Sequence, residues 1–459
     1  MRDALQTLLR TLPRTLLRRF VGAGAALALS SGLALATDAA SDAALVERGR
    51  YLAVAGDCAA CHTAHGKAPF SGGLAIASPL GAIYSTNITP SRSHGIGAYT
   101  LEQFSRAVRA GVRADGSHLY PAMPYTAYAK VSDADTAALY AYFMHGVQAV
   151  DTAPPPTRLP FPFNVRLSMG LWNWLYLDTR PFEADPARSA EWNRGAYLAQ
   201  GLAHCTTCHT PRNFLMAEKP ALYLQGASLG TWYAPDITPG KPGWDQAAMV
   251  AYLRTGHAAN GATAGGPMRE AIDLSFSKMA PADLAAIATY LQELPAPSIP
   301  AAPAAVSQVV TSDVTEMAGG LADGERLYRN NCASCHQVDG DGLRGLPALR
   351  NHPMLRHQNA DNVGMAILDG VWPEHGQGMP GFREELDDRE VAAIGSYVMT
   401  AFGGSAVGIT QQRVAVLRAG GESSPLLLLA QAGIVLAIGL VCILAGLLWR
   451  RWRRRRALA

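Results

Sequence analysis

The sequence predicts an all-α protein in which three tandem domains are followed by one C-terminal transmembrane helix. Three observations lead to this prediction. The pentapeptides CAACH (58–62), CTTCH (205–209) and CASCH (332–336) each follow a similar segment. Proline-rich stretches separate the three segments, and an uncharged apolar run lies near the C-terminus. The length of 459 residues suits about three domains.

Residues 1–36 have the pattern of a cleaved signal peptide. Five arginines precede an apolar run of small residues from Phe20 to Ala36, which ends in the small-x-small triplet ALA. This order of a basic and an apolar region before a small-residue site is typical of a secretory signal. We expect cleavage after Ala36 and ordinary secretion, because the surroundings of Arg18-Arg19 fit twin-arginine export poorly.

The first two predicted domains, over 40–150 and 190–297, are closer relatives of each other than of the third, over 320–405. RGRYLA before the first motif matches RGAYLA before the second, whereas the third is preceded by GERLY. Downstream, IYSTNITP at 83–90 corresponds to WYAPDITP at 232–239. We therefore expect each motif to end a short helix.

Each domain is predicted to close on a second helix. Apolar residues three apart share one face of a helix, which would pack against the opening helix. The pairs are Leu139 with Tyr142, Ile287 with Tyr290, and Ile394 with Tyr397. In the first domain, Ser132 and Asp135 have the spacing of a capping box at the start of this helix.

Two linkers are predicted, at 151–189 and 298–319, from the stretches APPPTRLPFPF and PAPSIPAAPAA. The first linker also contains an aromatic stretch from Phe161 to Phe182 with two tryptophans. We expect this stretch to pack between domains, because aromatic side chains favour buried contacts. Contact with the membrane surface or with a partner is the alternative.

The apolar run at 425–449 predicts a transmembrane helix, since it is long enough to cross a hydrocarbon core of about 30 Å. A buried core helix is the alternative, but only the basic tail at 450–459 follows to cover it. The tail's six arginines favour a cytoplasmic tail and periplasmic domains. Cys442 lies within the span as a small apolar residue. Without the charged leader residues and the tail arginines, 28 basic and 35 acidic residues give a charge near −7, which does not indicate a nucleic-acid partner.

The CxxCH motif is typical of covalent haem attachment, in which two thiols bond to one haem and the next residue's imidazole binds its iron. A reactive dithiol needs no fixed histidine, and a zinc site would have to join two motifs. Three copies within a shared repeat also argue against a chance match. The sequence therefore predicts three covalent haem c groups, attached at Cys58, Cys61 and His62, at Cys205, Cys208 and His209, and at Cys332, Cys335 and His336.

A haem that transfers electrons needs a sixth ligand, and a methionine thioether raises its potential. Met123, Met268 and Met379 each follow a motif, neighbour a proline and are expected in loops rich in glycine and proline, where core packing is a weak explanation. Other methionines lie in helical patterns and are expected in the core: Met144, Met249, Met279, Met365 and Met399. The rival sixth ligands are His118, His257 and His375.

Taken together, these features resemble the trihaem cytochrome c subunit of membrane-bound alcohol and sugar dehydrogenases. The most specific elements are the paired ITP segments and SAEWNRGAYLAQGLAHCTTCHTPRN around the second motif. Relatives serve quinohaemoprotein alcohol dehydrogenase and the flavin-dependent gluconate, sorbitol and fructose dehydrogenases. The resemblance covers nearly the whole mature chain and implies three all-helical cytochrome c-like domains.

The resemblance also implies a function. The subunit would take electrons from a separate PQQ- or flavin-dependent dehydrogenase subunit on the periplasmic side and pass them to ubiquinone in the inner membrane. It leaves room for a small third subunit. The cysteines and histidines of the motifs would hold the haems, with Met123, Met268 and Met379 as distal ligands.

A haem with both axial positions filled has no position for substrate, and the chain contains no dinucleotide fingerprint between a strand and a helix. We therefore expect an electron-transfer subunit without a catalytic residue of its own. Three alternatives stay open: a multihaem peroxidase, which needs a vacant iron position; a cytochrome subunit of a terminal oxidase; and a relay that serves a molybdenum hydroxylase. The partner's substrate is not encoded in this chain.

Overall fold

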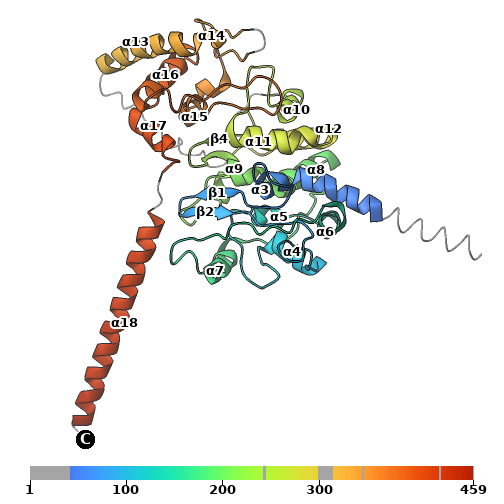
Figure 1. Cartoon of the computed structure of the whole chain (residues 1–459), viewed down its shortest axis with the longest axis vertical. Coiled ribbons are helices and arrows are strands. Elements are labelled where there is room, and N and C mark those ends of the chain that lie inside the picture. The colour runs from blue at the N-terminus through green and yellow to red at the C-terminus, as the bar shows by residue number, and fades with distance from the viewer. Residues whose placement is uncertain (1–41, 241–243, 298–313, 344–345, 423–424, 458–459) are drawn as a thin grey trace, which may run out of the picture.

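The computed structural model describes residues 42–240, 244–297, 314–343, 346–422 and 425–457. They form three helical units and one long helix that leaves them (Figure 1). These residues are mostly helical, as expected, and also contain two short antiparallel hairpins. The predicted signal peptide and most of the second linker lie outside the described residues.

The first unit runs from a helix over residues 42–55 to a closing helix that ends in a π-helical turn. Its hairpin pairs Ala75 with Tyr84 and Ser78 with Gly81. The remaining elements are α3 (Cys58–His62), β1 (Ala75–Ser78), β2 (Gly81–Tyr84), α4 (Leu101–Ala110), α5 (Tyr125–Tyr128), α6 (Asp133–Ala141) and η1 (Tyr142–Gly146).

The second unit repeats this order, with its own hairpin after the motif. Its elements are α8 (Ala190–Tyr197), η2 (Leu198–Leu202), α9 (Cys205–His209), η3 (Pro220–Leu222), β3 (Gln225–Ser228), β4 (Tyr233–Asp236), α10 (Gln246–Thr255), α11 (Gly266–Leu274), η4 (Phe276–Lys278) and α12 (Pro281–Gln292).

The third unit is shorter, and its described residues form no hairpin. Its elements are α13 (Val314–Asn331), α14 (Ala333–His336), η5 (Pro353–Arg356), α15 (Asp361–Asp369), α16 (Asp388–Ala401) and α17 (Gln411–Arg418).

Opening and closing helices cross closely in every unit, and a glycine permits each crossing. A Cβ added at Gly49, Gly195 or Gly324 would lie 1.9, 1.8 or 2.3 Å from a carbonyl oxygen of the closing helix. It would also lie 2.7–2.8 Å from the Cβ of Tyr142, Tyr290 or Tyr397. The tyrosines that the sequence pattern indicates therefore lie on the face of each closing helix that contacts the opening helix.

The first and second units share one hydrophobic core. A single cluster of buried side chains runs from Leu52 and Phe143 in the first unit to Leu198 and Ile287 in the second. The third unit has a separate core, which includes Leu327, Ile394 and Met399.

A tyrosine of the first unit completes the helix cap of the second. Tyr51 Oη donates to Asp283 Oδ2 (2.5 Å) and accepts from the N–H of Ala280 (3.2 Å). Ala280 is the N-cap of α12, and Asp283 lies in its first turn. Arg194 of the second unit forms an ion pair with the same carboxylate (2.7 Å).

A tyrosine of the second unit makes the equivalent contact with the first unit. Tyr197 Oη donates to Asp135 Oδ2 (2.6 Å) and accepts from the N–H of Ser132 (3.2 Å). Ser132 caps α6 by accepting from the N–H of Asp135, as the sequence predicts. The return bond of the expected capping box does not form directly, because the Asp135 carboxylate reaches Ser132 through the hydroxyl of Tyr197.

Hydrogen bonds also join the third unit to the second, and Trp232 of the second unit packs against the core of the third. Tyr233 and Asn362 exchange two hydrogen bonds, from the N–H of Tyr233 and to its carbonyl oxygen, each 2.8 Å long. The N–H of Glu374 donates to Asp273 Oδ2 (3.1 Å).

Two helices lie outside the three units. The aromatic stretch forms α7 (Leu167–Tyr176), whose Trp172 is buried beside Tyr125 of the first unit and Ala217 of the second, as expected. Trp174, in contrast, is exposed. Helix α18 (Leu426–Ala457) is long and apolar enough to cross a membrane, and its most apolar stretch is not buried among the described residues. This exposure contradicts the alternative of a buried core helix.

Candidate haem sites

The first two motifs form short helices of their own, α3 and α9. Each follows a residue in the left-handed conformation, Asp57 (φ 50°) or His204 (φ 36°), so the chain turns sharply before the first cysteine. The expectation that these motifs end the preceding helix is therefore wrong. In the third unit, Cys332 directly follows α13, and α14 begins at Ala333.

The three motif histidines are oriented in the same way. In each ring, Nδ1 lies within hydrogen-bond distance of a main-chain carbonyl oxygen: His62 with Thr86 (2.6 Å), His209 with Pro235 (2.7 Å) and His336 with Pro347 (3.1 Å). A carbonyl can only accept, so Nδ1 carries the proton and Nε2 keeps its lone pair. This is how proteins orient a histidine that binds a metal through Nε2.

Burial keeps the imidazoles neutral. It lowers the pKa of His62, His209 and His336, and the hydrogen bond to the carbonyl only partly opposes this effect. A neutral imidazole is the form that binds a metal.

The thiols do not have the character of reactive cysteines. All six are free and partly buried. Burial raises the pKa of Cys58, Cys61 and Cys205 to about 12 and that of Cys332 to about 11. Reactive dithiols need a lowered pKa, so this environment argues against a redox-active dithiol.

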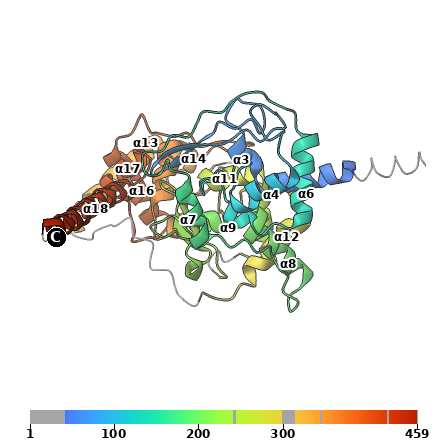
Figure 2. The same ribbon diagram turned by 90° about the horizontal axis from the view of Figure 1, so that it is seen from below.

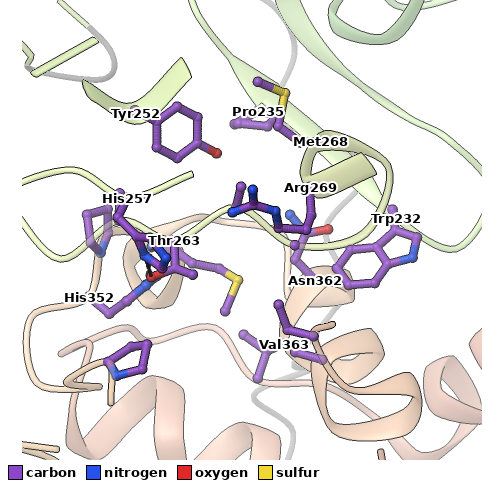
Figure 3. Close-up of a pocket in the computed structure, with 18 of the residues that line it drawn as sticks. Trp232, Pro235, Tyr252, His257, Thr263, Met268, Arg269, His352, Asn362 and Val363 are labelled. Atoms are coloured by element: carbon purple, nitrogen blue, oxygen red, sulfur yellow. Dashed lines mark hydrogen bonds between the residues drawn. The ribbon is translucent and has the colours of Figure 1, made fainter. Parts of the chain in front are cut away.

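The second and third motifs open into one cavity of about 1030 Å³ between their units. Figure 3 shows side chains of the second unit, including Trp232 and Tyr252, on one side and His352, Asn362 and Val363 of the third on the other. A single small-molecule site typically occupies about 300–1,000 Å³, so this cavity can hold bulky groups. Both sets of motif cysteines and histidines line it: Cys205, Cys208, His209, Cys332, Cys335 and His336.

The cavity lining fits haem. Apolar side chains from both cores line it, including Phe276, Ile287, Leu355 and Val398. The indole N–H of Trp244, which also lines it, is buried and finds no acceptor among the described residues. Buried donors are nearly always paired, so a bound group with carboxylates would supply what Trp244 lacks.

The candidate methionines occupy different local structures. Met268 and Met379 both line the cavity, and Met379 pairs with Val371 through two main-chain hydrogen bonds. Met123 lies in a turn before α5, partly buried against the shared core and beside Trp172. The expectation of a loop is wrong for Met268, which lies in the first turn of α11.

Two of the three rival histidines lie at the cavity, and the third lies elsewhere. His257 and His375 line the cavity. His118 lies against α7, where Arg166 donates to its carbonyl oxygen (3.0 Å) and a Cβ on Gly170 would approach its ring to 2.9 Å.

Two further histidines of the third unit escaped sequence reasoning. His352 and His357 both line the cavity. Burial lowers the pKa of His352 to about 4, and its Nδ1 accepts from the N–H of Met354. The pair in HPMLRH was the available signal, but it lies outside the repeated pattern.

Family models match two parts of the chain. The model for cytochrome c matches residues 46–146, and the model for cytochrome C oxidase, cbb3-type, subunit III, matches residues 319–398. Both are cytochrome models. The residues matched by the first contain the first CxxCH motif, and those matched by the second contain the third.

Whole-chain relatives are more specific. The fructose dehydrogenase cytochrome subunit of Gluconobacter japonicus is 42% identical over 458 residues, which cover 92% of this chain and 93% of that protein. The cytochrome c subunit of the quinone alcohol dehydrogenase of Gluconacetobacter polyoxogenes is 37% identical over 86% of this chain and 88% of its own. One subunit of the nicotinate dehydrogenase of Pseudomonas putida is 40% identical over 78% of this chain but only 30% of its own.

Proposed function

Because this chain belongs to the cytochrome c subunits of membrane-bound dehydrogenase complexes, we propose that it carries electrons through three covalent haem c groups from a catalytic dehydrogenase subunit to ubiquinone. The chain is an electron-transfer component of such a complex and not its catalytic subunit.

The shared geometry of the three motifs carries the proposal. Three CxxCH histidines, in three units, present a neutral ring whose Nδ1 is bound by a main-chain carbonyl. In this proposal each motif attaches one haem through its two cysteines and one histidine. Domains at 40–150, 190–297 and 320–405 would hold one haem each.

When bound, haem c supplies a one-electron couple. The protein's part is to fix the ligands and to exclude water. Thioethers from Met123, Met268 and Met379 would fill the second axial positions and raise the potentials. The cavity shared by the second and third sites would let both groups lie in one apolar space, which shortens the distance between them.

Membrane attachment places this relay beside its acceptor. Helix α18 would span the inner membrane, with the arginines that follow Leu448 on the cytoplasmic side. The predicted signal peptide agrees with periplasmic haem units. The partner on that side would be a PQQ- or flavin-dependent subunit, with room for a small third subunit.

The test is a haem count together with quinone reduction. The pyridine haemochrome spectrum of the purified chain should give three haems, and the Cys332→Ala/Cys335→Ala variant should give two. The native complex in lipid vesicles should reduce ubiquinone when its substrate is added. A count below three, or a complex that reduces only oxygen, would contradict the proposal.

One observation favours a second class of donor. The match to a nicotinate dehydrogenase keeps open a partner that oxidises an aromatic heterocycle, as a molybdenum hydroxylase would. Copurification of the solubilised complex, followed by cofactor analysis of its largest subunit, distinguishes PQQ, flavin and molybdenum. The terminal-oxidase alternative has weaker support, because the matching oxidase model covers only residues 319–398.

A further inference from the structure

We propose that α7 is a second membrane contact, which lies in the periplasmic lipid surface with its exposed apolar face in the headgroup and acyl boundary. This inference rests on the proposed transmembrane position of α18. It assigns a role to the aromatic stretch that electron transfer leaves unexplained.

The two faces of α7 differ in their contacts. Leu167, Leu171, Trp174 and Leu175 are 79%, 62%, 79% and 51% exposed. Their spacing of four, three and one places them on one face of the helix. Such a face is unfavourable in water, because burial of a large apolar side chain lowers the free energy by about 1.5–3 kcal/mol.

The opposite face holds α7 firmly to the protein. Trp172 is buried, and its indole N–H donates to the carbonyl oxygen of Leu215 (2.9 Å). Asn173 donates to the carbonyl oxygen of Ala110 (3.0 Å) and accepts from the hydroxyl of Tyr125 (2.8 Å). The helix therefore presents its apolar face from a fixed position.

Neighbouring segments add to the exposed apolar side chains. Phe161 lies just before α7, and the loop anchored by Trp172 carries Phe214 and Met216. Phe214 is 75% exposed, and Phe161 and Met216 are exposed as well. Apolar surface of this kind marks an interaction site. We refer to these three residues and the four on α7 as the α7 patch.

The α7 patch lies beside the start of the transmembrane helix. Gln431 in the second turn of α18 donates to the carbonyl oxygen of Phe161 (3.4 Å). In Figure 1, α7 lies at the lower edge of the helical units, on the side toward which α18 extends, and Figure 2 shows both helices on the near side when the molecule is seen from below. A bilayer that contains α18 therefore meets α7 first among the elements of the units.

The local charge also favours a lipid surface. The exported chain is acidic overall, yet residues 152–177 contain Arg158 and Arg166 and no Asp or Glu. Arginines near an apolar face attract anionic lipids, at about 1 kcal/mol for each cation close to the surface. Tryptophans such as Trp174 are enriched at this depth of a membrane.

The test compares lipid contact at matched positions in the full haem-loaded chain within its native complex. An environment-sensitive fluorophore is attached at Leu171→Cys or at Leu45→Cys, each in a Cys442→Ser background, and at native Cys442 as the marker for α18. Leu45 is an exposed apolar residue of the first helix. The complex is placed in vesicles of phosphatidylethanolamine and phosphatidylglycerol that carry a nitroxide near the headgroup or at the bilayer centre.

We expect the headgroup nitroxide to lower the fluorescence at position 171 about twofold or more, as for an interfacial helix. Position 45 should be unaffected, and Cys442 should respond to the central nitroxide. Quenching at Cys442 without quenching at position 171 would overturn the inference and leave the anchor intact. Absence of quenching at both positions would overturn both.

The dehydrogenase subunit is the other candidate for the α7 patch, and the same samples identify it. In that case position 171 would be shielded from a water-soluble quencher in the detergent-solubilised complex, lose this shielding when the catalytic subunit is removed, and remain unquenched by lipid nitroxides. That result would assign the patch to the partner and contradict lipid contact.

Discussion

At the scale of single residues, the main chain orients the motif histidines. The carbonyl oxygens of Thr86, Pro235 and Pro347 accept from Nδ1 of His62, His209 and His336. A main-chain acceptor cannot be removed by a side-chain substitution, so the orientation of the ring follows the path of the backbone. Thr86 lies just after β2, and Pro235 lies within β4.

Replacement of Met379 by alanine should separate haem attachment from distal ligation. We expect the haem count to stay at three, while one centre loses a thioether, binds carbon monoxide and shifts to a lower potential. Optical redox titration and carbon monoxide difference spectra measure this. Met365→Leu is the control, because Met365 is buried in α15 and such a volume-conserving change costs less than about 1.5 kcal/mol. An unchanged spectrum in the alanine variant would show that Met379 is not the ligand.

Replacement of Tyr197 by phenylalanine should weaken the joint between the first two units. The change removes a donor from the Asp135 carboxylate and an acceptor from the N–H of Ser132. Hydrogen bonds to charged groups contribute about 1.5–3 kcal/mol, so we expect a loss of that size in the free energy of unfolding. Tyr140→Phe is the control, since Tyr140 donates to a main-chain carbonyl within its own unit and should cost about 0.5–1.5 kcal/mol. If both variants lost the same free energy of unfolding, the contact of Tyr197 with the start of α6 would have no special role.

The stability contributed by Tyr51 and Tyr197, which join the first two units, should be lost at alkaline pH. Burial and the bond to aspartate raise the pKa of Tyr51 and of Tyr197 from 10 to about 12. A raised pKa of an acid means that the folded state favours the protonated form, so this stability is complete below about pH 10 and disappears as pH rises through about 12. The free energy of unfolding, measured between pH 8 and 12, should be higher for the wild type than for Tyr51→Phe/Tyr197→Phe at pH 8, and this difference should shrink as the pH rises. A constant difference would contradict this linkage.

The sequence indicates the candidate haem residues, but it does not indicate the tyrosine contacts between the first two units. CxxCH has chemical meaning in itself, and its pattern is local. Tyr51 and Tyr197 occupy equivalent positions in RGRYLA and RGAYLA, so the repeat showed their equivalence. It could not show that each tyrosine reaches the helix of the other unit, because that depends on how two apolar faces pack together.

At the scale of elements, a local rule misplaced Met268. Glycines and a proline before Met268 suggest a loop, yet proline is well suited to the first turn of a helix, where its missing N–H has no partner to lose. Pro267 takes this position in α11. The closing helices were predicted better, since the spacing of Ile394 and Tyr397 already defines a buried face.

The crossing of α13 and α16 depends on the absence of a side chain at Gly324. A Cβ there would lie 2.3 Å from the carbonyl oxygen of Ala393, so Gly324→Ala must push the helices apart. We expect the free energy of unfolding to fall by about 3 kcal/mol or more, which is the upper end of the range for overpacked cores. Gly320→Ala, in the same helix with no atom near its added Cβ, should gain about 0.5–1 kcal/mol. Urea unfolding of both variants measures this, and a neutral Gly324→Ala would show that the crossing tolerates expansion.

At the scale of the whole molecule, two cores hold three units together. Proline-rich linkers suggest units that fold separately, but the shared core and the crossed tyrosines join the first two. The third unit has its own core, against which Trp232 of the second unit packs, and polar contacts such as Tyr233 with Asn362 also attach it. Linker composition carries no information about which faces are buried together, so this grouping was not accessible to sequence reasoning.

Two cores predict two cooperative unfolding transitions, because side chains in one core lose their packing together. Scanning calorimetry of the haem-loaded chain in detergent should resolve two transitions and not three. Tyr197→Phe should lower only the transition of the first two units, and Gly324→Ala only that of the third, since sites in separate cores act independently. Absorbance of the haems at each step assigns the transitions. Three transitions, or one transition that both variants shift equally, would show that the boundaries between cores do not set the cooperative units.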